Sequence, residues 1–247
     1  MFRFFVDEAF DKVLMLSEED SHHYLKVLRI KENELVEIVA ENGNFSARFH
    51  HLEGKTVVLE KLKELKRENE SPIDLALAFG ILKNNNTEEI LKYCTEVGVS
   101  EFYPLYTDRV VSKIEKKEDL KIARWEKIIE SAAKQSKREI IPKLNSPVKI
   151  KDLEEISKRQ NRKIIMAYEE EKDLRFDEGK KYNKILLVVG PEGGFTKDEA
   201  EALKIMGADV ISLGRRILRA QTAAICASFY IIQSLERRDQ SFQKHIQ

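Results

Sequence analysis

Two short loops in the last third of the chain carry residues that could hold a small ligand and act on it. The first, Gly190–Phe195, reads GPEGGF and is uncharged apart from Glu192. The second, Leu213–Thr222, reads LGRRILRAQT and carries Arg215, Arg216 and Arg219. Glycine lets backbone amides come close to a ligand, and guanidinium groups stabilise anions through planar, paired donors. The two loops together predict a pocket for a small cofactor beside an anionic partner.

Each loop directly follows an apolar run, Ile185–Val189 for the first and Val210–Leu213 for the second. Short apolar runs bounded by glycine are typical of buried parallel strands, and ligands of open α/β sheets bind at the carboxyl ends of such strands. The glycine loop matches neither the dinucleotide nor the P-loop phosphate pattern and comes too late in the chain for an ordinary Rossmann enzyme. A plain turn is the alternative for this loop, but the neighbouring arginine loop counts against it.

Strands and helices alternate from Ile73 onward, which predicts an α/β domain. Helical spacing of Ile90, Leu91, Cys94 and Val97 predicts a helix that stops at Gly98. Pro104 suggests that its strand lies at an edge or ends early. The predicted strands are Ile73–Phe79, Phe102–Tyr106, Lys163–Tyr168 and the two runs above, and the predicted helices are Thr87–Val97, Leu120–Ser136, one capped by Thr196–Glu199, and Thr222–Leu235.

The first 65 or so residues instead predict a small β-rich domain with one helix. Ser17–Asp20 forms a capping box ahead of a helix that runs to Leu28. Asn42–Gly43 is a strong hairpin signal between two strands. The predicted strands are Glu34–Val39, Phe45–Phe49 and Thr56–Leu59, and the polar segment Lys61–Pro72 is expected to contain the domain boundary.

Composition limits the possible partners. The 247 residues contain 43 basic and 43 acidic side chains, so the formal net charge is zero and a strongly basic coat for nucleic acid is not expected. A local basic excess lies in residues 109–143, with 11 Lys/Arg against 6 Asp/Glu. The chain shows no signal peptide and no apolar run of the roughly 20 residues that span a bilayer, so we expect a cytoplasmic protein with no membrane partner.

No metal is expected. Cys94 and Cys226 lie in apolar helical patterns, which predicts two buried thiols rather than a disulfide or a zinc site. The histidine pairs His22–His23 and His50–His51 are expected to diverge as neighbours on a helix or strand do, and no third ligand is spaced for zinc.

Several segments in order resemble the RsmE family, the 16S ribosomal RNA uridine N3-methyltransferases of the SPOUT (trefoil-knot) superfamily. The resemblance lies in GPEGGF and LGRRILRAQTA, and in the opening Phe2–Val6 and the segment His23–Arg29. It extends through Thr95–Val99 with Pro104 and Asp108-Arg109, and through Trp125, Ala133, Gln135-Ser136, Arg138 and Pro142. It therefore covers nearly the whole chain.

Two positions depart from the family pattern. Gln221 stands where the family usually has glutamate, which keeps a hydrogen bond but loses the charge. Asn84–Asn86 replaces more usual charged residues after Lys83. Neither change removes the loops that would hold a cofactor.

The resemblance implies an α/β fold in two domains. Residues 1–68 would form a small PUA-like β-barrel that binds RNA, and residues 72–247 a C-terminal SPOUT-type parallel sheet with a trefoil knot. It also implies a homodimer and the cofactor S-adenosylmethionine, held by the loops Met166–Glu169, Gly190–Gly194 and Leu213–Ala220. The implied cofactor residues are Met166, Ala167, Tyr168, Gly190, Pro191, Glu192, Gly193, Gly194, Leu213, Gly214, Ile217, Leu218 and Ala220.

The implied reaction is methylation of uridine N3 in 16S ribosomal RNA of the small ribosomal subunit. Uridine N3 carries a proton, so the enzyme must favour the deprotonated base, whose negative charge an arginine can stabilise. Arg219 is the candidate for this role, while Arg215 and Arg216 would hold phosphate. Further candidate RNA contacts are Arg3, Arg29, Arg109, Gln135 and Arg138, for which a solvated surface position is the alternative.

Two other functions stay open on sequence alone. A non-catalytic RNA-binding protein of the same fold is one, with Gln221 as its support. A knotted methyltransferase acting on another RNA, such as transfer RNA, is the other, because the chain itself does not name a base. The stripe Phe229, Ile232 and Leu235 is expected to be core or dimer interface.

Overall fold

The computed structural model describes residues 1–66, 68–109, 118–171, 176–177 and 182–244, with side chains described as far as Arg237. The chain divides into two compact units. The first contains Met1–Glu70 together with Lys134–Ile140, and the second contains Ser71–Ala133 and Ile141–Gln247. The units are thus not two consecutive stretches of sequence, because a short later segment packs with the first.

The first unit is built on a five-stranded sheet in the order β1-β3-β4-β5-β2. Strands β1 and β3 are parallel, and the other pairs are antiparallel. One face packs on an apolar core that includes Phe4, Phe10 and Tyr24. The elements are β1 (Phe2–Phe5), β2 (Val13–Met15), α1 (Glu18–His22), the π-helical turn η1 (His23–Val27), β3 (Leu35–Ala40), β4 (Gly43–Glu53) and β5 (Thr56–Leu65).

Local signals in this unit act as the sequence indicates. Ser17 Oγ accepts a hydrogen bond from the Asp20 amide at 3.0 Å and so caps α1. Gly43, at φ +145°, opens β4 directly after the turn, and Ala40 pairs with it across the hairpin. The expected divergence of His50 and His51 is wrong: their Nδ1 atoms lie 2.6 Å apart, because a β-bulge between Phe49 and His51 breaks the alternation of the strand.

Residues 134–140 are fastened to the first unit by charged groups. Arg3 pairs with Glu37 at 2.7 Å and donates to the carbonyls of Lys137 and Arg138. Arg138 makes paired hydrogen bonds to the Glu70 carboxylate, the shortest at 2.8 Å. Both arginines are buried, so their guanidinium groups hold this segment, which we call the strap, against the unit that begins the chain.

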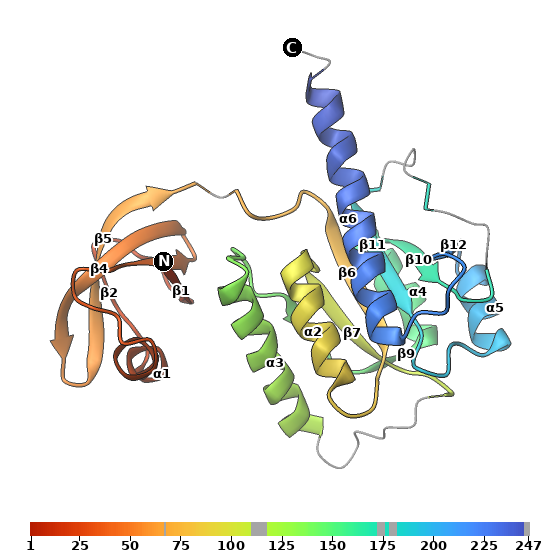
Figure 1. The fold of residues 1–247 in the computed structure, drawn as a ribbon, viewed down its shortest axis with the longest axis horizontal. Helices are drawn as coiled ribbons and strands as arrows, with labels where there is room; N and C mark the ends of the chain where they lie inside the picture. Colours follow the sequence, from red (N-terminus) through yellow and green to blue (C-terminus); the bar gives the residue numbers. More distant parts are fainter. Residues whose placement is uncertain (67, 110–117, 172–175, 178–181, 245–247) are drawn as a thin grey trace. The chain divides into compact units, whose positions relative to one another are not determined.

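The second unit contains a parallel sheet in the order β12-β10-β11-β6-β7-β8, with β9 also paired to β7 (Figure 1). Its strands are β6 (Asp74–Gly80), β7 (Glu101–Tyr106), β8 (Lys143–Leu144), β9 (Val148–Lys149), β10 (Lys163–Ala167), β11 (Lys184–Val189) and β12 (Asp209–Ile211). Its helices are α2 (Asn86–Val97), α3 (Glu118–Gln135, whose last two residues belong to the strap), the 3₁₀ turn η2 (Ile150–Asp152), α4 (Leu153–Gln160), α5 (Lys197–Ile205) and α6 (Ala220–Lys244).

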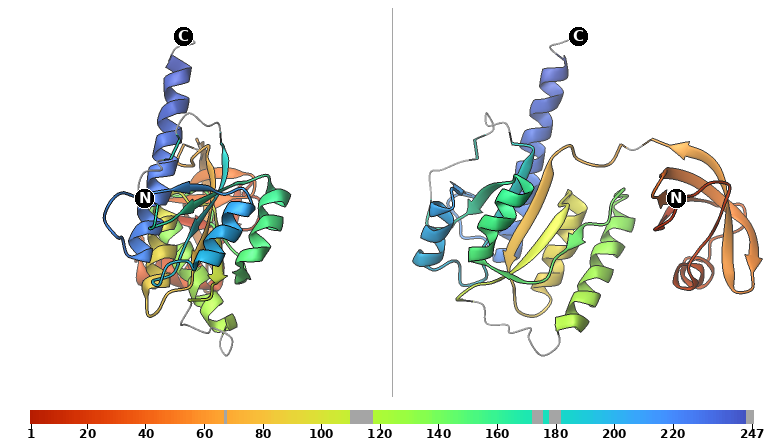
Figure 2. Two further views of the ribbon diagram at one scale, coloured as in Figure 1. Left: turned by 90° about the vertical axis from the view of Figure 1, so that its right-hand side faces the viewer. Right: turned by 180° about the vertical axis from the view of Figure 1, so that it is seen from behind.

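Helices cover both faces of this sheet, as the two further views show (Figure 2). In β6, Leu75, Leu77 and Phe79 face one core with α2, α3 and α6, whereas Ala76 and Ala78 face the other with α4 and α5. A strand buried on both faces reads as a continuous apolar run, which is why β6, β10 and β11 were recognisable.

Pro104 does not lie on an edge strand. It pairs with Phe79 of β6 on one side, and on the other side β8 pairs with Glu101–Phe102 while β9 pairs with Leu105–Tyr106. The missing N–H of proline therefore falls between two short partner strands, where neither strand requires it.

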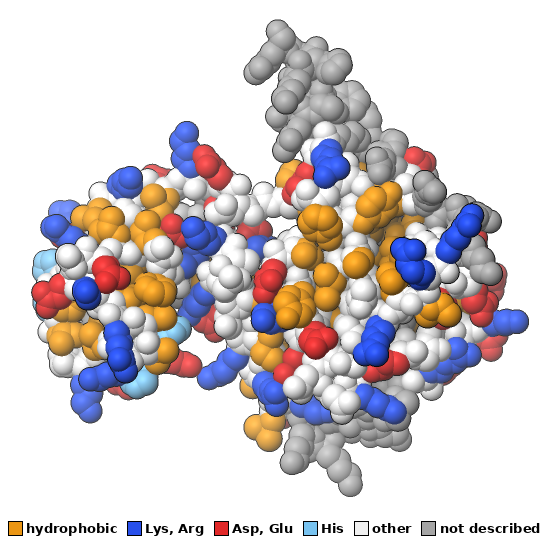
Figure 3. Space-filling view, viewed as in Figure 1, with side chains coloured by type: hydrophobic (Ala, Val, Ile, Leu, Met, Phe, Trp, Pro, Cys, Tyr) orange, Lys and Arg blue, Asp and Glu red, His pale blue; other side chains and the backbone are white. Residues whose placement is uncertain are grey.

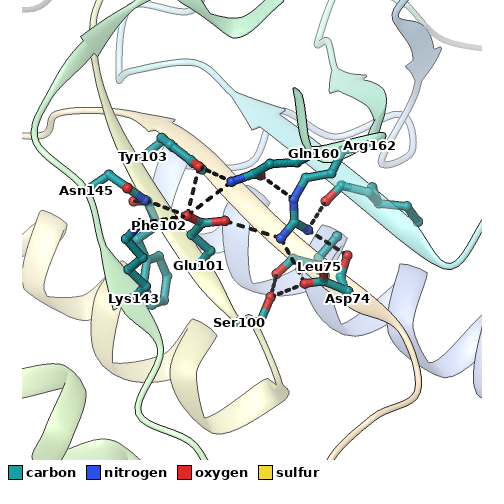
Figure 4. Close-up of polar contacts among 11 residues, drawn as sticks. Asp74, Leu75, Ser100, Glu101, Phe102, Tyr103, Lys143, Asn145, Gln160 and Arg162 are labelled. Atoms are coloured by element: carbon teal, nitrogen blue, oxygen red, sulfur yellow. Dashed lines mark hydrogen bonds and ion pairs between the residues drawn. The ribbon is translucent and has the colours of Figure 1, made fainter. Parts of the chain in front are cut away.

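A buried polar cluster joins the amino ends of the strands (Figure 4). Arg162, only 8% exposed, donates to the Asp74 carbonyl and carboxylate, each at 2.9 Å, and to Glu101 at 3.2 Å. Glu101 also accepts from Tyr103 Oη at 2.8 Å. Burial, followed by this hydrogen bond and the charge of Glu101, raises the pKa of Tyr103 to about 12, so the phenol keeps its proton.

Removal of Arg162 should therefore destabilise the second unit without a direct effect on the loops at the carboxyl ends of the strands. We expect Arg162→Ala to lower the free energy of unfolding by about 3–5 kcal/mol, because Glu101 is left buried without its partner. Chemical denaturation measures this loss. The double variant R162M/E101Q should lose less than R162A alone, and a loss below about 1 kcal/mol in R162A would contradict the assignment.

Candidate functional site

The three loops predicted to hold a cofactor lie side by side at one edge of the sheet. They follow β10, β11 and β12, which are neighbours and parallel, so their carboxyl ends point the same way. The Tyr168 amide donates to the Ile211 carbonyl at 3.1 Å and joins the first loop to the end of β12, just before the third loop. Met166, Ala167, Tyr168, Pro191 and Ala220 are buried, Gly190, Gly194, Leu213 and Leu218 are partly buried, and Glu192, Gly193, Gly214 and Ile217 are exposed.

The position of the glycine loop depends on Gly80, a residue that no sequence motif indicated. A Cβ built on Gly80, the last residue of β6, would lie 2.5 Å from the Pro191 nitrogen and 2.8 Å from its Cα. Only glycine lets the two backbones approach this closely. The glycine at the end of β6 therefore sets the position of the Gly190–Gly194 loop.

Two carboxylates, those of Glu169 and Glu192, lie at the same loop. Gly194 has φ +67°, and a Cβ there would lie 1.9 Å from Glu169 Oε1, so the Glu169 carboxylate occupies the space beside its backbone. Glu192 accepts from the Lys83 amide at 3.0 Å. The adjacent Asn84 is left-handed at φ +54°, a conformation that asparagine tolerates better than most residues, which accounts for an asparagine after Lys83.

The third loop leads into α6 and leaves its arginines in solvent. The Arg219 carbonyl accepts from the Ala223 amide at 2.8 Å, so the backbone of Arg219 belongs to the first turn of α6. The side chains of Arg215, Arg216 and Arg219 are exposed, and within the described part of the chain no ion pair is found for them. Three exposed guanidinium groups on the third loop are suited to an anionic substrate.

Gln221 lies in the first turn of α6 and is 9% exposed. Its Oε1 is buried with no hydrogen-bond partner in the described structure. A buried acceptor without a partner costs free energy, so a glutamine at this position needs a donor from outside the described residues. Burial of Tyr168 in the first loop, followed by its hydrogen bond to Glu170, raises the pKa of its phenol, which therefore stays neutral.

The candidate RNA contacts divide into two groups. Arg29 and Gln135 are exposed in the first unit, and Arg109 is exposed in the second. Arg3 and Arg138 are 9% and 4% exposed and pair with Glu37 and Glu70, which gives them a structural role in holding the strap. Contact of either arginine with RNA stays a prediction. The sequence alone cannot distinguish a buried arginine that binds distant backbone carbonyls from an arginine exposed to solvent, because the two show the same local pattern.

The cysteine prediction holds for one residue. Cys94 is buried, and burial raises the pKa of its thiol to about 12. Cys226 is exposed, because it lies on the solvent side of α6. Among the described residues, no three His, Cys, Asp or Glu side chains are arranged to hold a metal ion, and no helix carries an apolar stretch that could cross a bilayer.

Comparison with known proteins agrees with this arrangement. The model of the RNA methyltransferase domain matches residues 69–232. The ribosomal RNA small subunit methyltransferase E of Mesomycoplasma hyopneumoniae (strain 232) is 34% identical over 225 residues, covering 91% of this chain and 96% of that protein. The protein of the same name from Bacillus subtilis (strain 168) is 31% identical and covers 86% of both chains.

A solved structure is similar over almost the full length. The crystal structure of a ribosomal RNA small subunit methyltransferase E from Neisseria gonorrhoeae, bound to S-adenosyl methionine, superposes with a TM-score of 0.85 at 27% identity, covering 95% of this chain and 98% of that one. From the matched domain and these full-length relatives, the chain belongs to the RNA methyltransferase family, in the group of the ribosomal RNA small subunit methyltransferase E proteins.

Proposed function

We propose that the protein transfers a methyl group from S-adenosylmethionine to uridine N3 in 16S ribosomal RNA of the small ribosomal subunit, in the cytoplasm. The observation that carries the proposal is the set of three adjoining loops, with free arginines in the third, in a chain similar over nearly its whole length to ribosomal RNA small subunit methyltransferase E proteins.

The residues present fit S-adenosylmethionine. Gly80 lets β6 and the Gly190–Gly194 loop approach closely, the Glu169 carboxylate lies against Gly194, and the buried Gln221 acceptor lacks a donor in the described structure. Tyr168, the Gly190–Gly194 backbone and the segment Leu213–Ala220 would hold the cofactor, and the carboxylates of Glu169 and Glu192 suit its positive charge. Bound there, it supplies a methyl group already activated by the sulfonium.

Arg219 would act on the base. Its backbone is fixed by α6 while its guanidinium is free, so it can pair with the uracil oxygens as water takes up the N3 proton. Negative charge then spreads onto O2 and O4, which a permanent cation stabilises. Alignment of N3 with the methyl group of the bound cofactor would supply much of the remaining acceleration. Arg215 and Arg216 would bind phosphate.

The finer features of the fold are part of the proposal. β12 lies at one end of the sheet beside β10, yet the next helix, α6, packs on α2 and against β6 and β11. The chain between them must cross back past β10, which supports a trefoil knot through the cofactor loops. The five-stranded sheet of the first unit supports a PUA-like barrel for RNA, with Arg29 and Gln135 as candidate contacts.

The experiment that tests the reaction is nucleoside mass spectrometry of small-subunit RNA. Subunits that lack N3-methyluridine are incubated with the protein and S-adenosylmethionine, and N3-methyluridine should appear at one site. No product despite cofactor binding would move the search to other RNAs, including transfer RNA. Failure to bind the cofactor would favour a non-catalytic RNA-binding protein.

A homodimer through α6 is the proposed assembly. Apolar side chains gather on the exposed surface over α2 and α6 (Figure 3). Phe229 is 52% exposed, and Tyr230 and Tyr93 of α2 are each 39% exposed, whereas Ile232 and Leu235 are core. Exposed aromatic patches on a soluble domain mark interaction surfaces.

Phe229→Asp should therefore weaken the dimer by at least about tenfold, because a central aromatic contact is replaced by a buried charge. Light scattering coupled to size exclusion over a dilution series measures the change. Ile205→Asp is the matched control, since Ile205 is 79% exposed on α5. A wild-type monomer, or equal dissociation of both variants, would exclude this interface.

A further inference from the structure

The segment that follows β7 contacts the glycine loop and the first turn of α5. Arg109 Nη1 donates to the Gly193 carbonyl at 2.6 Å, and the Asp108 amide donates to Glu199 Oε1 at 2.8 Å. These residues come from a strand two places away from β11 in the sheet. The glycine loop is thus held by the segment after β7 as well as by its own flanking elements, β11 and α5.

Glu199 connects the second contact to the start of α5. Its Oε2 accepts from the Thr196 amide at 2.8 Å, and Thr196 Oγ1 accepts from the Glu199 amide at 3.2 Å. The carboxylate is 8% exposed, so both oxygens are satisfied in a low-dielectric place. The helix that begins right after the glycine loop is therefore fixed to Asp108.

Arg109 also packs on the loop. A Cβ on Gly193 would lie 3.3 Å from both Cβ and Cδ of Arg109, so the aliphatic stem covers Gly193 while the guanidinium binds its carbonyl. Tyr168 in the first loop is influenced as well: its pKa is raised chiefly by burial, and the positive charge of Arg109 opposes the rise. The stem and the guanidinium of Arg109 thus both contact the Gly190–Gly194 loop.

We propose that Arg109 is a positioning residue that holds the Gly193 carbonyl and so keeps the Gly190–Gly194 loop in the conformation that binds S-adenosylmethionine. This rests on the proposed function, because it assumes that the loop binds that cofactor. It differs from a role in RNA contact, because the effect exists before any RNA is present.

Calorimetric titration of S-adenosylmethionine into the full-length protein, without RNA, is the test. Arg109→Ala should weaken binding about threefold to tenfold, as expected for loss of a charge-assisted hydrogen bond in a solvent-accessible place. Arg109→Lys should restore part of the affinity, because ammonium can still donate to the carbonyl. Arg124→Ala is the control: it removes an exposed arginine whose partner is Glu88, far along the sequence from the loop, and should bind as wild type.

A double-mutant cycle with Gly193→Ala sharpens the test. The three atoms nearest to the new methyl all belong to the Arg109 stem, so G193A should weaken cofactor binding in the wild-type background and much less in R109A. In turnover assays, R109A should raise KM for the cofactor with kcat nearly unchanged. Thermal unfolding of each variant checks that the fold is kept.

Equal cofactor affinity of R109A and wild type would overturn the inference. If KM for RNA then rises, Arg109 is an RNA contact; if it does not, the side chain is merely solvated. A wild-type protein that does not bind S-adenosylmethionine would instead overturn the proposed function, and this inference with it.

Discussion

Arg219→Ala is expected to reduce methyl transfer by at least about a hundredfold, in the range seen when one donor to a developing anion is removed. The alanine variant leaves the charge on uracil O2 and O4 without its permanent cation, while the loop backbone that would bind the cofactor stays in place, since the Arg219 carbonyl is held by Ala223. Single-turnover transfer of labelled methyl to small-subunit RNA measures the rate, and calorimetry should show nearly unchanged cofactor affinity.

Two comparisons make this result specific. Raising the pH should recover part of the R219A rate, because hydroxide then supplies the N3-deprotonated base without the arginine. Arg215→Ala and Arg216→Ala should instead raise KM for RNA and flatten its dependence on salt, as loss of a phosphate contact does. Turnover of R219A equal to wild type would remove Arg219 from the mechanism.

Gly80→Ala is expected to displace the glycine loop and weaken cofactor binding by at least about tenfold. The methyl would meet backbone atoms of Pro191 at 2.5–2.8 Å, which cannot rotate away as a side chain can, so either the loop or β6 must move. Overpacking of this kind costs about 1–3 kcal/mol of stability. Calorimetric titration and denaturant unfolding measure the two effects separately.

Gly207→Ala is the matched control for this substitution. Gly207 has φ +84° and open space around the new Cβ, so the variant should lose stability through backbone strain while it keeps cofactor affinity. Wild-type affinity in G80A would show that the loop does not depend on this close approach.

Much of the second unit could be predicted from sequence because its signals are local. Runs such as Ile185–Val189 are apolar on both faces, Thr196 and Glu199 form the expected capping box, and Gly98 ends α2 in a left-handed conformation. The loops after β10, β11 and β12 could be grouped because parallel strands place their carboxyl ends together. The short helix α4 went unrecognised, since only Leu153 and Ile156 on it are buried.

Features that depend on distant contacts could not be predicted. Gly80 resembles any glycine at the end of a strand, and its constraint comes from Pro191, far along the chain. Glu199 was recognisable as part of a cap but not as the acceptor for Asp108. Arg3 and Arg138 looked like surface charges, because nothing near them in sequence reveals the carbonyls and carboxylates that bury them.

The strap has a consequence for how the chain is made. Arg3 and Glu70 are synthesised well before their partners in the strap, Lys137 and Arg138. The residues synthesised in between, Ser71–Ala133, belong to the other unit. During synthesis the first unit therefore emerges early, but the Arg138–Glu70 ion pair and the hydrogen bonds from Arg3 to the strap carbonyls cannot form until Arg138 has left the ribosome, by which time α2 and β7 are already outside. The first unit is thus completed by a segment that is made after residues 71–133, and a fragment ending at residue 70 leaves the Arg3 guanidinium without its carbonyl acceptors.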